Sequence, residues 1–255
     1  MIAWAEAARS QLRMHRHCQH YTERLCVFRD SLKEFYALHR YPEVVPSVAD
    51  FSWYTPAFRE VMDKGRDERV GEVITPREEF MEMVNAAAEE WRKDMARRLY
   101  DMIPPEARSQ TKRNNDATPT DEQILRTLNA SVTWFRCTVK GCVLDYPRVL
   151  AHECAKTGPP INLNPETDMD DLQNAYNIIL REFPWNFTGD KVVYDMDAHR
   201  AAEKIVQVTL ANTDAVPALT DKFWLDNLDE RYVCGECSKD SHVYVMPWRV
   251  AVSAL

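Results

Sequence analysis

Apolar side chains recur on one side of a helical projection through the first forty residues of the chain. The pattern is carried by Leu25, Phe28, Leu32, Phe35 and Tyr36. It predicts a helix within residues 1–41, because positions three and four apart share one face of an α-helix. Two prolines at positions 42 and 46 then interrupt it. We expect a second helix from Thr55-Pro56, with Thr55 as the N-cap and Pro56 in the first turn.

The clearest predicted helix begins after a capping box at Thr75-x-x-Glu78 and ends at Pro104-Pro105. One apolar stripe runs along it, with steps of three or four residues. Its members are Phe80, Val84, Ala88, Trp91, Met95, Leu99 and Met102. A stripe of this kind is typical of a helix that packs against the protein's own core, rather than of one that binds in a groove of another protein.

Residues 106–119 are polar and lack large apolar side chains, which predicts a linker or long loop. Thr120 then caps a short helix, in which we expect Ile124, Leu125 and Leu128 to face inward. The run SVTWFRC at 131–137 reads as a strand, and helices follow near 168–182 and 197–211. The tail returns to strand-like RYVC and HVYV. We therefore expect a helical region at 1–105, a linker at 106–119 and an α+β region at 120–255.

The strongest chemical signal is the run Cys137-x4-Cys142-x9-His152-x-Cys154. Two cysteines with two to four residues between them form a knuckle, a tight turn that directs both thiolates at one metal ion. Thiolate and imidazole ligands together favour Zn²⁺, which has no geometric preference of its own. On a helix, His152 and Cys154 would point to nearly opposite sides, so both can bind one ion only if the chain there is a turn or loop. If the segment before His152 stays helical, only His152 joins Cys137 and Cys142.

A second cluster follows at Cys234-x2-Cys237-x4-His242. Gly235 lies between its two cysteines, as a knuckle turn favours. The sequence leaves open two arrangements: two separate zinc sites, or one shared site that joins Cys137 and Cys142 to Cys234 and Cys237. We favour two units, because the first cluster has four ligands of its own. Isolated cysteines are usually small buried apolar residues, but close pairs with a following histidine favour zinc over that reading, over a thioredoxin-like motif and over an iron–sulfur cluster.

The two clusters lie in similar surroundings. Each unit runs from an aromatic strand through a cysteine knuckle to a proline and an Arg-Val pair, Arg148-Val149 in the first and Arg249-Val250 in the second. Aligned on Arg-Val, Ser253 takes the place of His152. The second unit is then a zinc unit with one ligand lost and His242 as the substitute.

Overall charge and composition limit the classes of function. The formal net charge is −8, and the chain contains 7 cysteines, an odd number. A chain with a net negative charge is repelled by nucleic acid and by an anionic membrane, so it is not expected to bind along either. We find neither a signal peptide nor an apolar run of about 18 residues that could span a membrane. We therefore expect an intracellular protein, in the cytoplasm or nucleus, whose thiols stay reduced.

Segments 58–80, 89–104, 135–154 and 232–255 resemble an uncharacterised zinc-binding protein family of mushroom-forming fungi, many members of which carry an F-box-like segment upstream. The resemblance implies that Cys137, Cys142, His152, Cys154, Cys234 and Cys237 are zinc ligands. The family's tail pattern would place a histidine near the end, where this chain has Ala254. No F-box leucine and proline signature precedes residue 40, so an adaptor role in ubiquitin ligation is not expected.

These observations predict an α+β, predominantly helical fold, with a helical N-terminal half and a zinc-stabilised C-terminal half that has short strands at its cysteine knuckles. The favoured function is a protein-interaction module with structural Zn²⁺ ions, because no catalytic motif is present. One alternative is a nucleic-acid-binding zinc finger, for which the spacing and the acidity are unfavourable. A zinc enzyme with an open metal position, and Glu153 as a base, is a weaker alternative.

Overall fold

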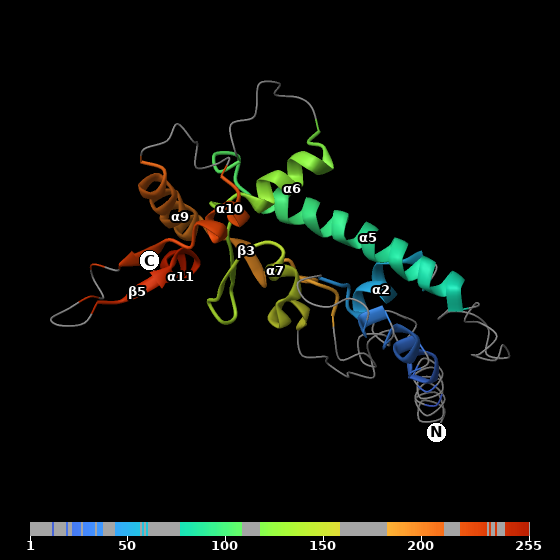
Figure 1. The fold of residues 1–255 in the computed structure, drawn as a ribbon. Helices are drawn as coiled ribbons and strands as arrows, with labels where there is room; N and C mark the ends of the chain where they lie inside the picture. The colour runs from blue at the N-terminus through green and yellow to red at the C-terminus, as the bar shows by residue number, and fades with distance from the viewer. Residues whose placement is uncertain are drawn as a thin grey trace. The chain divides into compact units, whose positions relative to one another are not determined.

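The computed structural model describes residues 44–56, 77–108, 118–158, 183–211, 220–233 and 243–254, with short runs and single residues between 12 and 60 and at 235 and 238. Helices predominate in these segments, and a few short antiparallel strands accompany them (Figure 1). That mixture confirms the α+β, mainly helical part of the prediction. The helix expected at 168–182 and the capping box at Thr75 lie outside the described residues.

The chain divides into two compact units that interleave along the sequence. Unit 1 consists of Met1–Arg92 and Ala155–Thr188, and unit 2 of Lys93–Cys154 and Gly189–Leu255. Helix α5, Arg77–Met102, contains the point at which the first unit passes into the second. The linker expected at 106–119 stays a prediction, because positions 109–117 lie outside the described residues.

The core of unit 1 is rich in phenylalanine. Phe28 and Phe58 meet edge to face with 4.7 Å between their ring centroids, and Phe80 of α5 lies 6.1 Å from each of these rings. Such edge-to-face pairs place the positive rim of one ring against the negative face of the next. The other buried members include Leu25, Leu32, Phe35, Phe51, Val84 and Ala88. The helical stripe predicted within 1–41 is therefore confirmed where the structure describes it.

A helix absent from the sequence prediction, α2, spans Val48–Tyr54. Ser47 caps it, and the side chains of Ser47 and Asp50 form a reciprocal capping box. Asp50 is fully buried and also accepts a hydrogen bond of 2.8 Å from the Trp185 backbone N–H. One carboxylate thus caps a helix and ties a segment from 135 residues later in the chain to it.

Unit 2 contains a three-stranded antiparallel sheet in the order β2-β1-β3. Its strands are β1, Phe135–Cys137, β2, Val143–Leu144, and β3, Val192–Tyr194. Strand β1 is shorter than the predicted 131–137, because Ser131 and Val132 form a turn. Helix α6, Asp121–Asn129, begins at Thr120 as expected. Its Ile124 and Leu128 are buried, but Leu125, predicted to face inward, is exposed.

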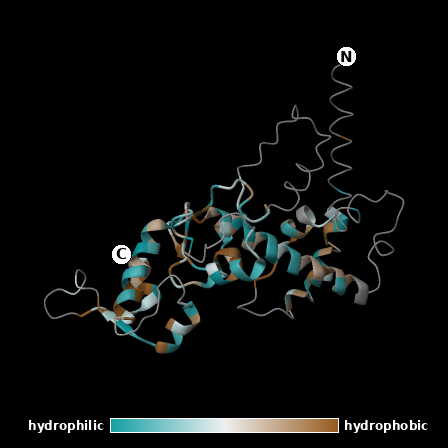
Figure 2. Ribbon diagram, turned by 90° about the horizontal axis from the view of Figure 1, so that it is seen from above, coloured by the Kyte–Doolittle hydropathy of each residue, from teal (hydrophilic) through white to brown (hydrophobic). Residues whose placement is uncertain are grey.

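The rest of unit 2 surrounds a second core. Helix α9, Met196–Thr209, confirms the helix predicted near 197–211, and α10 spans Lys222–Leu228. Strands β4, Arg231–Val233, and β5, Val245–Pro247, pair antiparallel, and α11, Trp248–Ala254, follows directly. The described helices carry both hydrophilic and hydrophobic residues (Figure 2). The buried apolar residues of this core include Val132, Trp134, Ala202, Val206, Leu225, Trp248 and Val252.

Candidate metal centre

Cys137 ends strand β1 and begins a tight hairpin to β2. Its backbone N–H donates to the Cys142 carbonyl at 2.9 Å, and its own carbonyl accepts from the Gly141 N–H at 2.8 Å. Gly141 has φ +69°, a left-handed conformation that glycine adopts without a Cβ clash. The Lys140 N–H points at the Cys137 sulfur, with 3.4 Å between nitrogen and Sγ. This turn presents a thiol with a backbone donor already directed at it, as expected for a knuckle.

Short helical turns carry the chain from β2 back to this thiol. Helix α7, Arg148–Ala151, is a single turn and ends at His152, whose backbone is extended at φ −69° and ψ 120°. A 3₁₀ turn, η1, follows over Glu153–Lys156. Because the helix stops before His152, the His152 and Cys154 side chains need not diverge. The sequence left this point open, and the end of α7 at Ala151 allows both side chains to reach Cys137.

The ligand atoms of Cys137, His152 and Cys154 lie within 4.8 Å of one another, and this cluster could hold a metal ion. Both sulfurs are inside the fold, since Cys137 is 0% exposed and Cys154 is 5% exposed. The His152 Nε2 is buried and makes no hydrogen bond to any part of the chain that the structure describes. A buried polar atom without a partner is unfavourable. A metal ion at the cluster would supply that partner.

The surroundings of the cluster shift the pKa values of its three side chains in different directions. Burial opposes ionisation of the Cys137 thiol, but hydrogen bonds from the backbone N–H groups of Lys140 and Val139 outweigh it and lower the Cys137 pKa. Burial and the neighbouring Cys137 raise the pKa of Cys154. Burial, then the Lys140 charge, lower the pKa of His152, which keeps the imidazole neutral. The imidazole is thus available as a neutral ligand, the Cys137 thiol ionises more readily than the Cys154 thiol, and metal binding would displace the thiol protons.

Cys142 lies on the other side of the same knuckle. Its carbonyl pairs with the Cys137 N–H, its side chain is half-buried, and a negative charge there raises the pKa of Cys154. Its sulfur is not among the three ligand atoms within 4.8 Å. The second predicted cluster, Cys234, Cys237 and His242, lies outside the described residues. The strands that flank it in the sequence, β4 and β5, pair antiparallel, as β1 and β2 do.

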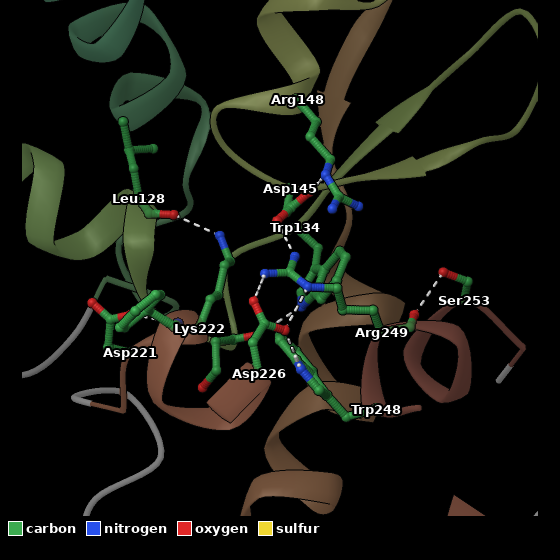
Figure 3. A network of polar contacts seen from close by, with 12 residues as sticks. Leu128, Trp134, Asp145, Arg148, Asp221, Lys222, Asp226, Trp248, Arg249 and Ser253 are labelled. Carbon is green, nitrogen blue, oxygen red and sulfur yellow. Dashed lines mark hydrogen bonds and ion pairs between the residues drawn. The ribbon is translucent and has the colours of Figure 1, made fainter. Parts of the chain in front are cut away.

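A cluster of charged side chains next to the knuckle was missed by the sequence analysis (Figure 3). Asp145, 3% exposed, accepts from Arg249 in a short contact and lies 3.8 Å from the Arg148 Nε. Arg249 also pairs with Asp226 through two hydrogen bonds, of 2.9 and 2.7 Å. A signal was available, because Asp145 and Arg249 are single charges within otherwise apolar runs. In the sequence, Arg249 served only to align the second Arg-Val pair with the first.

Comparison of the chain with protein-family models, with curated proteins and with solved structures finds no match. Within the described residues, no helix has both the length and the apolar character needed to cross a membrane. The site must therefore be interpreted from its own chemistry.

Proposed function

We propose that Cys137, His152 and Cys154, with Cys142 as the fourth ligand, bind a structural zinc ion that stabilises unit 2. The observation that carries the proposal is the buried His152 Nε2, which lacks a hydrogen-bond partner among the described residues and lies beside two buried thiols. Two or three thiolates with one imidazole form a donor set that Zn²⁺ accepts in tetrahedral sites. Ligand atoms in such a site are about 3.3–3.8 Å apart, so the three atoms need only a small inward shift to bind one ion.

A structural role is favoured over a catalytic one by burial and by ligand number. Catalytic zinc keeps one position open to water, whereas structural zinc is closed by four protein ligands. Cys142 is the candidate for the fourth ligand, because it lies in the same knuckle and its carbonyl accepts a hydrogen bond from the Cys137 N–H. The metal then joins the β1–β2 hairpin to the end of α7.

We extend the proposal to a second zinc unit at Cys234, Cys237 and His242. It is supported by the shared order of elements, because β4–β5, Pro247 and α11 repeat the order β1–β2, Pro147 and α7. The biological role that fits a metal-stabilised module without a catalytic constellation is binding of another protein. Exposed apolar side chains on the second hairpin support that role, since Val233 and Val245 are cross-strand neighbours and both are more than half exposed. The resemblance to the fungal zinc-binding proteins, stated from the sequence, is likewise part of this proposal.

The test is metal content and cobalt substitution in purified protein. Zinc should copurify, and Co²⁺ should give the intense visible bands of a tetrahedral thiolate site. Cys137→Ser and His152→Ala should each remove one equivalent of metal, whereas Cys26→Ser, which changes an exposed thiol far from the cluster in sequence, should remove none. Protein that contains no metal, and whose thermal unfolding is unchanged by chelators, would refute the proposal.

The same samples distinguish the remaining arrangements. If Cys234→Ser releases the ion that Cys137→Ser releases, while Cys154→Ser does not, one shared site joins the two knuckles. If Cys234→Ser leaves one ion tightly bound and Cys142→Ser removes that ion, the first unit binds its zinc independently of the second cluster. A cobalt spectrum that shifts when azide or cyanide is added would reveal an open position and would favour a zinc enzyme over a structural site.

A further inference from the structure

Asp145 lies where the chain turns from the cysteine hairpin towards His152. It directly follows β2, and its backbone carbonyl accepts a hydrogen bond of 2.9 Å from the Val149 N–H in the first turn of α7. Helix α7 has only four residues, and His152 is its C-cap. A displacement of Asp145 therefore moves α7 and His152 with it, because the first turn of so short a helix is held by this hydrogen bond and by one from the Leu150 N–H to the Pro147 carbonyl.

The Asp145 side chain is held mainly by an arginine from a distant part of the sequence. The Arg249 Nη1 donates to the Asp145 Oδ2, and the Arg148 Nε approaches the other carboxylate oxygen only to 3.8 Å. Arg148 is more than half exposed, whereas the Arg249 side chain is 22% exposed. The more buried arginine is thus the principal partner of the buried carboxylate.

Arg249 is fixed on three sides (Figure 3). Asp226 accepts from its Nε and Nη2, in the bidentate geometry that a guanidinium favours. Its guanidinium carbon lies 4.8 Å from the Trp248 ring centroid, and the Trp248 indole N–H donates to the same Asp226 at 2.8 Å. A side chain so restrained can hold Asp145 in one position at little further loss of conformational freedom.

We propose that Arg249 is a positioning residue for the metal centre: by pairing with Asp145 it holds α7 so that His152 lies beside Cys137. This inference rests on the proposed zinc site. It adds a residue of α11, outside the segment 137–154 that contains the ligands, which affects how tightly the ion is bound. Without Arg249 the buried carboxylate has no adequate partner and moves towards water, since an uncompensated buried charge is strongly unfavourable. That movement draws the His152 imidazole away from the thiols.

The experiment compares variants for Zn²⁺ affinity, by competition with a chromophoric chelator, and for the Co²⁺ spectrum. Arg249→Met should weaken Zn²⁺ binding by about 10–100-fold, the range seen when groups that orient metal ligands are removed. Its cobalt bands should lose intensity as the tetrahedral geometry is distorted. Arg249→Lys should recover part of the affinity. Arg231→Met is the matched control, because Arg231 forms an exposed ion pair with Asp229 in the same unit.

The double variant Asp145→Asn with Arg249→Met separates positioning from a general loss of stability. It removes the carboxylate that Arg249 compensates, so affinity and spectrum should return to within about threefold of the unmodified protein. Arg249→Met that binds Zn²⁺ as tightly as the unmodified protein, or a double variant as weak as the single one, would overturn the inference. Either outcome leaves the zinc site itself standing, whereas absence of metal from the unmodified protein refutes the proposed function.

Discussion

Lys222 places a potentially charged ammonium group inside the core of unit 2. The side chain is 4% exposed, its Nζ donates to the Leu128 carbonyl at 2.7 Å, and it lies 5.9 Å from the Trp134 ring centroid. Burial lowers the Lys222 pKa to about 7, against the opposing effect of Asp145, while Arg249 lowers it further. The folded protein therefore holds this lysine largely neutral at mildly alkaline pH.

A lowered pKa of this kind makes stability depend on pH in a defined direction. The unfolded chain holds the Lys222 proton up to a pKa of about 10.4. Between about pH 7 and pH 10 the unfolded state binds more protons, so the free energy of unfolding should rise with pH by up to about 1.4 kcal/mol per pH unit. Below pH 7 the lysine is charged in both states, and its destabilising effect is present in full.

Urea unfolding at pH 7, 8 and 9, with metal bound and thiols reduced, tests this expectation. Lys222→Met removes the titrating group and should flatten the pH dependence relative to the unmodified protein. The difference between the two proteins isolates Lys222 from the pH dependence of metal binding, which both share. Parallel pH profiles for the two proteins would contradict the assignment.

Single residues could be predicted from the sequence where their contacts are formed by neighbours in the chain. The candidate ligands Cys137, His152 and Cys154 could be named from spacing, because a knuckle is a local structure. Lys222 could not be recognised, since its burial results from packing against Leu128 of α6 and against Trp134, both distant in the sequence. Leu125 shows the reverse case: it was expected in the core because it is apolar and lies in a short helix, but it is exposed.

Helices α2 and α6 carry the same type of cap in different surroundings. At α6, Thr120 and Gln123 exchange hydrogen bonds at an exposed N-terminus. At α2, Asp50 accepts from the Ser47 N–H and hydroxyl and also from Trp185, all within the fold. Loss of Asp50 therefore removes a cap and leaves a buried N–H unsatisfied.

Asp50→Ala should destabilise the protein by about 2–5 kcal/mol, the sum of a lost cap and an orphaned buried donor. Thr120→Ala, the matched control, should cost only about 1 kcal/mol, because water can solvate the exposed N–H groups of α6. Both values come from chemical denaturation with metal bound. Equal losses in the two variants would show that the Trp185 contact contributes nothing.

At the scale of elements, long periodic patterns were informative and short ones were not. The stripe of α5 predicted its buried face, because seven apolar residues at helical spacing leave few alternatives. Helix α2 was missed because seven residues give only two turns of pattern, and its capping box uses aspartate rather than glutamate. Whether His152 and Cys154 share a site depended on where α7 ends, which hydrophobic periodicity in a single turn does not define.

Chelation should act on the two units differently. Structural zinc contributes about 10 kcal/mol or more to the folding of small modules, which is comparable to the stability of a whole domain. Removal of metal should therefore increase amide hydrogen exchange in β1, β2, α7 and, through Arg249, in α11. The amides of α2 and of the Val84 turn in α5 belong to unit 1 and should keep their protection.

Hydrogen exchange with and without a chelator provides the measurement, and the His152→Ala variant provides the control. That variant should resemble the chelated protein before any chelator is added. Equal loss of protection in both units would mean that the metal does not act locally. Unchanged exchange everywhere would remove the structural role from the proposed ion.

The interleaving of the two units has a consequence for synthesis on the ribosome. Unit 1 cannot be complete until Thr188 has left the exit tunnel, because the Asp50 carboxylate accepts a hydrogen bond from the Trp185 backbone N–H. By then Cys137, Cys142, His152 and Cys154 have already emerged, while α11 and its arginine have not been made. A metal captured at this stage would close the loop before its positioning residue exists, and residues translated later would then fix a site that is already filled.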